Sequence, residues 1–227
     1  MKLYNYFRSG TSFRVRIALN LKGLSYEYVP VHLVKGEQHT DAYRAISPDP
    51  SVPLLDVQGN PDEALLSQSM AVVEYLDETH PEPPLLPKDA LARAHVRALA
   101  QTIACDTHPL GNLRVLKYLG RDLNADDAAR AAWYNHWVLS GLQSYERRLE
   151  RLAQWRASNG LPPSVYSWGS TPTLADVCLV PQVVNGQRFG LSYDDKNLPL
   201  TLAAFNACMK LDAFERAHPR NCPDAEA

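Results

Sequence analysis

One short, proline-rich segment constrains the fold of this chain most, because it divides the sequence into two unlike parts. Residues 80–87 read HPEPPLLP, so four of the eight are proline. Proline lacks a backbone N–H and fixes φ, so neither a helix nor a central strand can continue through this segment. Short β-rich runs precede it, and Ala-, Leu- and Arg-rich sequence follows it. We therefore predict two domains, residues 1–80 and 89–227, joined by an extended linker at residues 81–88.

The first part predicts a small sheet with helices on its faces. A strand, a helix and a strand follow one another within about thirty residues, so the first two strands should be parallel. Gly23 supplies a helix stop, and a turn is expected at residues 58–61. The order β-α-β-α-β-β-α has its strands at residues 2–6, 26–31, 53–57 and 64–66, and its helices at residues 13–22, 41–45 and 69–79.

The second part predicts helices throughout. Long helical patterns cover residues 90–119 and 125–157, and shorter ones cover residues 173–185 and 200–213. Thr173 is followed three positions later by Asp176, which predicts a capping box at the start of the third helix.

The composition excludes several classes of protein. The chain has 227 residues, is 45% hydrophobic and carries a net charge of −2, which favours a packed core and argues against binding nucleic-acid phosphates. No apolar run has the length of a membrane span, and the N-terminus lacks the apolar region of a secretory signal. The four cysteines form no CxxC pair, and the histidines show no metal-ligand spacing. We expect a cytoplasmic protein with no metal, nucleic-acid or membrane partner.

The most informative local feature is a hydroxyl-rich turn between the first strand and the first helix. Ser9, Thr11 and Ser12 lie in this turn. A helix N-terminus offers free N–H groups and a positive dipole end, so such a turn favours a phosphate, a carboxylate or a thiolate. The alternative interpretation is that Ser12 serves only as the helix N-cap.

Three arginines accompany this turn. Arg8, Arg14 and Arg16 lie near one end of the helix, and a guanidinium matches a carboxylate bidentately. They predict a cationic cluster for an anionic ligand. One or two of them could instead form structural ion pairs or contact a partner.

Two further turns could bind a peptide-like ligand. Pro53 opens a strand, and a cis bond after Val52 would turn the Val52 backbone outward as an edge. Gln68 and Ser69 form a second strand-to-helix turn that could bind a carboxylate or simply cap the helix.

Taken in order along the chain, these motifs resemble the zeta class of the glutathione transferases. That resemblance implies an α/β thioredoxin-like N-terminal domain, an all-α C-terminal domain, a homodimer and glutathione as cofactor. The stretch from Arg8 to Leu19 looks like the Ser-Ser-Cys signature of that class, with Ser-Gly-Thr in its place. The other matches are Gly36–His39, Val52-Pro53, Gln68-Ser69, Asn112-Leu113, Leu174–Val183 and Arg188-Phe189.

The resemblance also implies roles for individual residues. Ser9 would stabilise the glutathione thiolate, with Gly10 and Thr11 completing the turn. Val52 and Pro53 would pair with the cysteinyl part, Gln68 and Ser69 with the γ-glutamyl end, and His39, where the family usually has Gln, with the glycine end. Arg8 and Arg188 would hold substrate carboxylates. His108 and Asn112, four residues apart and so on one helical face, would lie above the sulfur, and Cys105 could face the same cleft or fill the core.

The activity implied by the resemblance is glutathione-dependent cis–trans isomerisation of a maleyl keto acid, maleylacetoacetate or maleylpyruvate, in aromatic catabolism. Reversible thiolate addition would make the alkene bond single and let it rotate. Two alternatives remain open at this point. One is conjugation or dehalogenation of α-halo acids, which would consume glutathione. The other is a non-catalytic module that assembles with other proteins, against which the complete set of binding motifs argues.

Overall fold

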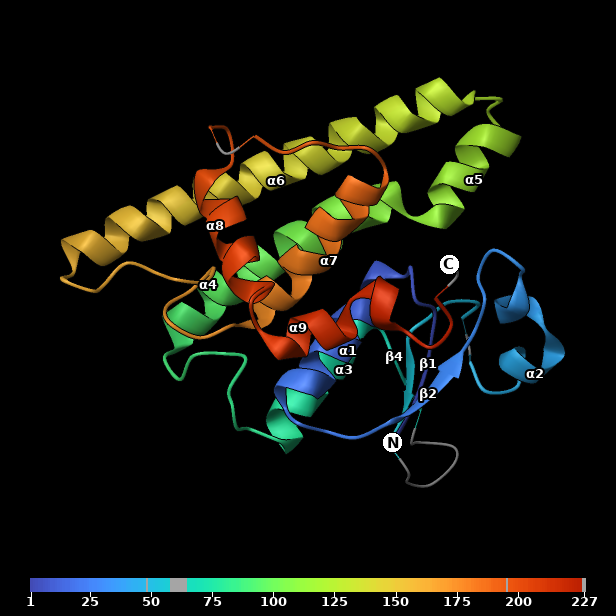
Figure 1. The fold of residues 1–227 in the computed structure, drawn as a ribbon, viewed down its shortest axis with the longest axis horizontal. Helices are drawn as coiled ribbons and strands as arrows, with labels where there is room; N and C mark the ends of the chain where they lie inside the picture. Colours follow the sequence, from blue (N-terminus) through green and yellow to red (C-terminus); the bar gives the residue numbers. More distant parts are fainter. Residues whose placement is uncertain (48, 58–64, 195, 226–227) are drawn as a thin grey trace. The chain divides into compact units, whose positions relative to one another are not determined.

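The computed structural model describes residues 1–47, 49–57, 65–194 and 196–225, and the chain divides into two compact units (Figure 1). The first unit combines Met1–Pro84 with Met209–Ala227, and the second is Leu85–Cys208. The division after Pro84 falls within the segment predicted as the linker. The C-terminal residues differ from the prediction, because the sequence assigns all of 89–227 to one helical domain.

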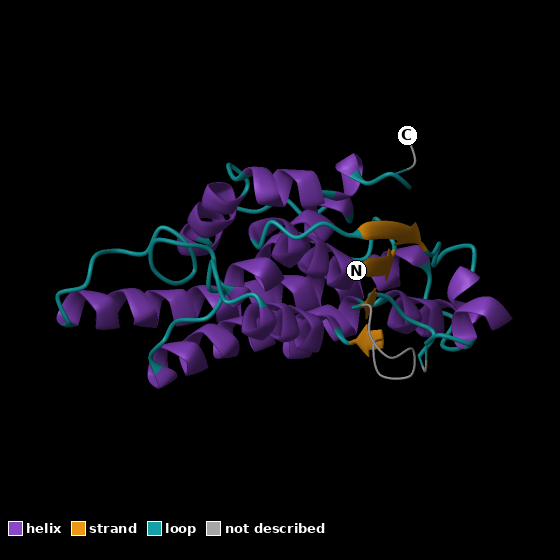
Figure 2. Ribbon diagram, turned by 90° about the horizontal axis from the view of Figure 1, so that it is seen from below, coloured by secondary structure: helices purple, strands orange, loops and turns teal. Residues whose placement is uncertain are grey.

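The described strands of the first unit form a mixed sheet. They are β1 (Lys2–Asn5), β2 (Glu27–Pro30), β3 (Leu54–Asp56) and β4 (Leu65–Ser67). Their order is β2-β1-β3-β4 (orange in Figure 2). The β1–β2 pair is parallel, as the βαβ pattern predicts, and the β1–β3 and β3–β4 pairs are antiparallel. The predicted turn at residues 58–61 lies outside the described residues.

Two helices bury the apolar face of this sheet. They are α1 (Gly10–Leu21) and α3 (Ser69–Thr79), which pack against each other. Every residue of α1 from Ser12 to Leu19 is buried, and Leu3 and Leu55 of the sheet are fully buried. The short helix α2 (Asp41–Arg44) and a 3-10 turn (Glu37–His39) precede β3. The buried face of α1 fixes its N-terminus beside the ends of β1 and β3.

The C-terminal segment completes the first unit, which corrects two sequence predictions. The predicted helix at residues 200–213 ends at Cys208, and a separate helix, α9 (Asp212–Ala217), packs on α1 (Figure 1). Asn20 donates to the Ala213 carbonyl over 3.0 Å. This contact and the burial of Phe214 explain why the segment joins the first unit instead of the helical one.

The last described residues also contact the turn after β1. The Asp224 carboxylate accepts a hydrogen bond from the Phe7 N–H over 3.2 Å and another from the Tyr28 hydroxyl. Burial of Tyr28 and its bond to Asp224 both raise the pKa of the tyrosine hydroxyl. The tail therefore anchors the peptide that leads into the hydroxyl-rich turn.

The second unit packs its helices around a common core. They are α4 (Ala90–Gln101), α5 (Leu113–Arg121), α6 (Asp127–Ser158), α7 (Leu174–Arg188) and α8 (Pro199–Cys208). The predicted capping box of α7 is present: Asp176 accepts from the Thr173 N–H at 2.8 Å and from its hydroxyl at 3.0 Å. Burial raises the pKa of Asp176, while these hydrogen bonds and those from Ser167 act in the opposite direction.

The predicted continuous helix at residues 90–119 is wrong. Helix α4 ends at Gln101 and continues as a π-helical turn (Thr102–Thr107) and a 3-10 turn (His108–Gly111) before α5. Pro109 has no N–H for a helical hydrogen bond, and the Thr107 hydroxyl donates to the Thr102 carbonyl over 2.7 Å. Cys105, within the π-helical turn, is exposed instead of filling the core. Among the described residues, no helix has the length and apolar character needed to cross a membrane.

Candidate functional site

Four polar groups form a connected hydrogen-bonded set at the N-terminus of α1. Ser9 is the N-cap, and its Oγ accepts from the Ser12 N–H over 3.2 Å. The Ser9 and Thr11 hydroxyl oxygens lie 2.8 Å apart, and Thr11 Oγ1 donates to the Val52 carbonyl over 3.0 Å. The alternative that Ser12 caps the helix is wrong, because Ser12 is fully buried inside the first turn. Its hydroxyl has no hydrogen-bond partner among the described residues.

This arrangement suits an anion. Gly10 is the first residue of α1, and the following N–H groups are those that a helix leaves without intrahelical acceptors. No acidic residue lies in the first turn of α1, so nothing there opposes the positive end of the dipole. Ser9 and Thr11 are partly exposed. A thiolate or carboxylate placed here would meet two hydroxyl groups and the positive end of the helix dipole together.

Arg16 serves the structure of this turn and does not belong to a ligand-binding cluster. Its side chain is 1% exposed. The guanidinium donates to Asn5 Oδ1 (2.9 Å), the Phe7 carbonyl (3.0 Å), the Ala217 carbonyl (3.0 Å) and the Tyr6 carbonyl (3.5 Å). The prediction that three arginines gather around an anionic ligand is therefore wrong for Arg16.

The other two arginines differ from each other. Arg14 is buried, and its Nη1 donates to the Ser69 hydroxyl over 3.3 Å, so the cation connects the two predicted turns. Its Nε has no hydrogen-bond partner among the described residues. Arg8 is partly exposed and lies over the Phe7 ring at 4.8 Å. Only Arg8 of the three keeps a partly exposed guanidinium beside the hydroxyl-rich turn.

The Val52–Pro53 peptide bond is cis, and it immediately precedes β3. Both side chains are buried, while the Val52 carbonyl accepts the Thr11 hydrogen bond. The structure thus brings the backbone of Val52 next to the hydroxyl-rich turn.

The second strand-to-helix turn has a strained backbone. Gln68 has φ 66° and ψ 106°, values that a residue with a side chain rarely adopts. Such strain persists where the surrounding structure enforces it, often at binding sites. Ser69 follows as the first residue of α3 and is 5% exposed. With Arg14 behind its hydroxyl, this helix N-terminus is a second place for a carboxylate.

His39 lies apart from these turns. It ends the 3-10 turn, is exposed, and donates its N–H to the Gly36 carbonyl over 2.9 Å. No contact of the structure joins its side chain to the two turns within the described residues. Its predicted role at the far end of an extended ligand remains a prediction.

In the second unit, Tyr134 lies between the end of α7, which carries Arg188, and the 3-10 turn that begins at His108. The sequence alone did not indicate this tyrosine. Its ring packs on Phe189 with centroids 4.0 Å apart, and a Cβ at Gly111 would lie 2.8 Å from it. Burial raises the pKa of Tyr134 to about 12, against the opposing charge of Arg188. Only its position on a helical face could have suggested it. Tyr134 therefore places Arg188, at the end of α7, near the turn that follows His108.

The predicted common face of His108 and Asn112 does not exist. His108 begins the 3-10 turn, whereas Asn112 has extended backbone and caps α5, accepting from the Arg114 N–H over 3.1 Å. Both are partly exposed. The 3-10 turn at His108–Gly111 and the extended backbone of Asn112 separate them, so they do not share a helical face.

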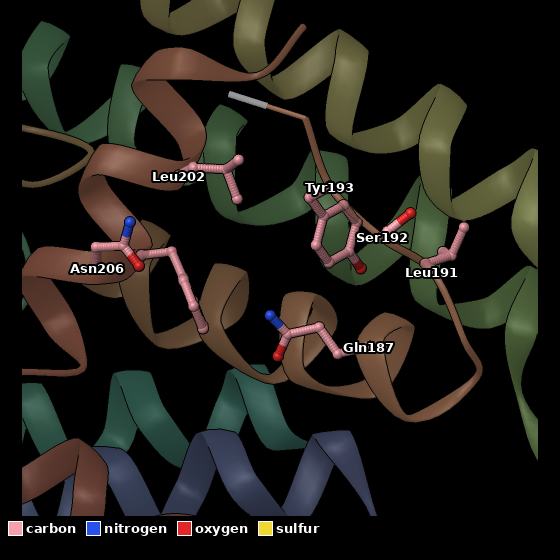
Figure 3. A pocket seen from close by; sticks show the side chains of 7 residues that line it. Gln187, Leu191, Ser192, Tyr193, Leu202 and Asn206 are labelled. Atoms are coloured by element: carbon pink, nitrogen blue, oxygen red, sulfur yellow. The ribbon is translucent and has the colours of Figure 1, made fainter. Parts of the chain in front are cut away.

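A separate pocket of about 220 Å³ lies in the second unit (Figure 3). Its polar side chains are those of Gln187, Ser192, Tyr193 and Asn206, and the Tyr193 hydroxyl donates to the Val183 carbonyl over 3.1 Å. It contains no acid–base pair and none of the predicted site residues. Among the described residues, no group of three or more His, Cys, Asp or Glu side chains could hold a metal ion.

Comparisons with known proteins identify the family of this chain. The family model "Glutathione S-transferase, N-terminal domain" matches residues 3–84. The chain is 47% identical to the maleylpyruvate isomerase of Ralstonia (99% of this chain, 100% of the relative) and 41% identical to the maleylacetoacetate isomerase of Pseudomonas aeruginosa (100% of both).

Solved structures of the same two kinds of isomerase are also similar to this chain. A holo structure of a maleylpyruvate isomerase, described as a bacterial glutathione S-transferase of the zeta class, is 47% identical over all of both chains, with a TM-score of 0.87. The maleylacetoacetate isomerase of Anaeromyxobacter dehalogenans, with glutathione bound in its active site, is 40% identical, with a TM-score of 0.84 and 99% and 97% coverage.

Proposed function

Because this chain belongs to the zeta class of the glutathione transferases, we infer that it is a glutathione-dependent cis–trans isomerase. It converts a maleyl keto acid, maleylacetoacetate or maleylpyruvate, to its fumaryl isomer in the catabolism of aromatic compounds. The observation that carries this function is the partly exposed Ser9 hydroxyl at the N-terminus of α1, beside the Val52 carbonyl.

The residues present fit glutathione. The tripeptide needs a polar edge for its peptide groups, a donor for its sulfur and a site for its γ-glutamyl carboxylate. Val52 with Pro53 supplies the edge, Ser9 with Gly10 and Thr11 supplies the donor, and Gln68 with Ser69 supplies the carboxylate site. The Arg14 cation behind Ser69 strengthens that last site. In this proposal His39 holds the glycine end.

Each residue then has a task in the reaction. When bound, glutathione supplies a thiolate that adds reversibly to the cis alkene and so permits rotation about the former double bond. Ser9 donates a hydrogen bond to the sulfur, and the α1 dipole favours its negative charge. Arg8 and Arg188 hold the substrate carboxylates and stabilise negative charge that develops on the substrate carbonyl oxygen. In this proposal His108 and Asn112 lie above the glutathione sulfur. We further propose a cytoplasmic homodimer, in keeping with the class.

The direct test is a spectrophotometric assay with maleylpyruvate and with maleylacetoacetate, each with and without glutathione. We expect turnover only with glutathione, which is recovered unchanged, and a preference between the acids identifies the substrate. Activity that ignores glutathione would contradict the mechanism. Consumption of glutathione in proportion to product would favour conjugation or dehalogenation. A lack of both turnover and glutathione binding would favour a non-catalytic module.

Arg188→Gln tests the substrate role of the exposed guanidinium at the end of α7. Losing a charge-assisted hydrogen bond of about 1.5–3 kcal/mol should raise KM for the maleyl acid about tenfold to hundredfold. KM for glutathione should stay within about twofold, because Arg188 has no role in holding glutathione in this proposal. Arg151→Gln, which removes an exposed arginine of α6, is the matched control. An unchanged KM for the maleyl acid would exclude this role.

A further inference from the structure

The polar groups at the α1 N-terminus have a defined donor direction. A carbonyl oxygen only accepts, so Thr11 must donate its single hydroxyl proton to Val52. The 2.8 Å bond between the two hydroxyls then has Ser9 as its donor. Ser9 Oγ in turn accepts from the Ser12 N–H. The hydrogen bonds therefore run one way, from Ser12 through Ser9 and Thr11 to the Val52 carbonyl.

Because the hydrogen bonds run in this direction, the Ser9 hydroxyl proton is already used in the bond to Thr11. In the structure it points to Thr11, so it is not available to a sulfur atom. For Ser9 to stabilise a thiolate, its O–H must rotate away from Thr11. Ser9 then no longer donates to Thr11, and Thr11 Oγ1 no longer accepts a hydrogen bond from Ser9. The lowest-cost replacement is for Thr11 to turn its own proton toward Ser9, provided that the Val52 carbonyl finds another donor.

A peptide-like cofactor supplies that other donor. We propose that Thr11 is a positioning residue that couples docking of glutathione on the Val52 carbonyl to donation from Ser9 to the sulfur. This inference rests on the proposed function. An amide N–H of the cofactor would give the Val52 carbonyl a donor other than Thr11, so the Thr11 hydroxyl would be free to rotate and donate to Ser9, and the Ser9 hydroxyl to rotate and donate to the thiolate. Only two C–O rotations occur, so no proton leaves its oxygen.

The residue type at position 11 matters for this coupling. A threonine hydroxyl is one donor and one acceptor, so it can take part in either direction of the chain. A cysteine, which the class usually has here, is a much weaker donor. Valine has the shape of threonine without the hydroxyl, so Thr11→Val removes the coupling while keeping the volume. Thr11→Ser keeps the hydroxyl and should restore it.

Two binding measurements test the proposal without relying on turnover. The first is the thiolate fraction of bound glutathione, titrated by ultraviolet absorbance. The second is the affinity for S-methylglutathione, which has no thiol, measured by calorimetry. For Thr11→Val we expect a thiolate fraction at neutral pH about five- to tenfold smaller than in the wild type, because the bond from Thr11 to Ser9 that supports donation to the sulfur is lost. A larger fraction, which is the result if Thr11 only holds the Ser9 proton away from the sulfur, would overturn the coupling. Affinity for S-methylglutathione should stay within about twofold, and Thr11→Ser should match the wild type in both.

The outcomes separate this proposal from the proposed function. Equal thiolate fractions in the wild type and Thr11→Val would overturn the coupling, while the isomerase function would stand. An equal loss of affinity for both ligands would also overturn it, since Thr11 would then act only by shaping the site. A wild-type protein that binds neither ligand would contradict the proposed function itself. Thr11→Ala gives the same comparison if the valine variant does not fold.

Discussion

Replacing Ser9 with alanine will lower isomerase turnover about 100- to 1000-fold, the usual cost of removing a donor to developing negative charge. In the proposed mechanism Ser9 is the hydroxyl that donates to the glutathione sulfur, and the helix dipole alone then remains to favour the thiolate. The measurement is kcat with saturating glutathione and maleyl acid, together with the thiolate absorbance of bound glutathione. Turnover within about threefold of the wild type would show that the helix N-terminus suffices.

A control is needed because Ser9 is also the N-cap of α1. Loss of a cap costs about 1 kcal/mol of stability in its own right. Asp126 caps α6, accepting from the Ala129 N–H over 2.7 Å, so Asp126→Ala removes a comparable cap in the second unit. We expect Asp126→Ala to lose similar stability and to retain turnover. If both variants lost turnover equally, stability and not chemistry would explain the effect of Ser9→Ala.

Replacing Arg16 with methionine will reduce the free energy of unfolding by about 3–5 kcal/mol, the range for breaking a buried charged network. Methionine fills much of the volume but leaves buried oxygens of Asn5, Phe7 and Ala217 without their donor. Arg16→Lys should recover little, because a single ammonium cannot span acceptors placed around a planar fork. Urea unfolding with an unchanged m-value measures the loss.

Arg121 supplies the matched control for Arg16. Its side chain is 83% exposed and forms an ion pair with the neighbouring Asp122. Arg121→Met should change the free energy of unfolding by less than about 1 kcal/mol. A similarly small change for Arg16→Met would mean that the buried guanidinium is dispensable and that the turn before Ser9 is held by other contacts.

Local signals in the sequence predicted the local structure well. Prolines at residues 81–87 marked a break, short β-rich runs located the strands, and the βαβ rule gave the parallel β1–β2 pair. The helix predicted at residues 69–79 has those bounds in the structure. Thr173 and Asp176 formed the expected capping box. Each of these rests on residues within a few positions of one another, so backbone geometry and nearby hydrogen bonds suffice to specify them.

Predictions failed where the tertiary structure, and not the local sequence pattern, determines the backbone conformation or the burial of a side chain. The helical pattern at residues 90–119 continues through Pro109, but the chain forms a π-helical turn before this proline and a 3-10 turn that contains it. The three arginines near α1 looked alike in sequence, and only burial distinguishes the partly exposed Arg8 from Arg16. Nothing local pointed to Tyr134, whose importance comes from its contacts with Phe189 and Gly111.

The sequence by itself determined the order of elements before the proline-rich segment, the turns that carry the hydroxyls and the family resemblance. Tertiary structure decided which groups those turns meet. The Thr11 hydroxyl reaches Val52 across 41 positions of sequence, and Arg16 reaches Ala217 across 201. The direction of the hydroxyl chain and the burial of Arg16 follow from those contacts. The physical reason is that a hydrogen-bond donor is assigned by the acceptors around it, and these are gathered by packing of the core and not by neighbours in the chain.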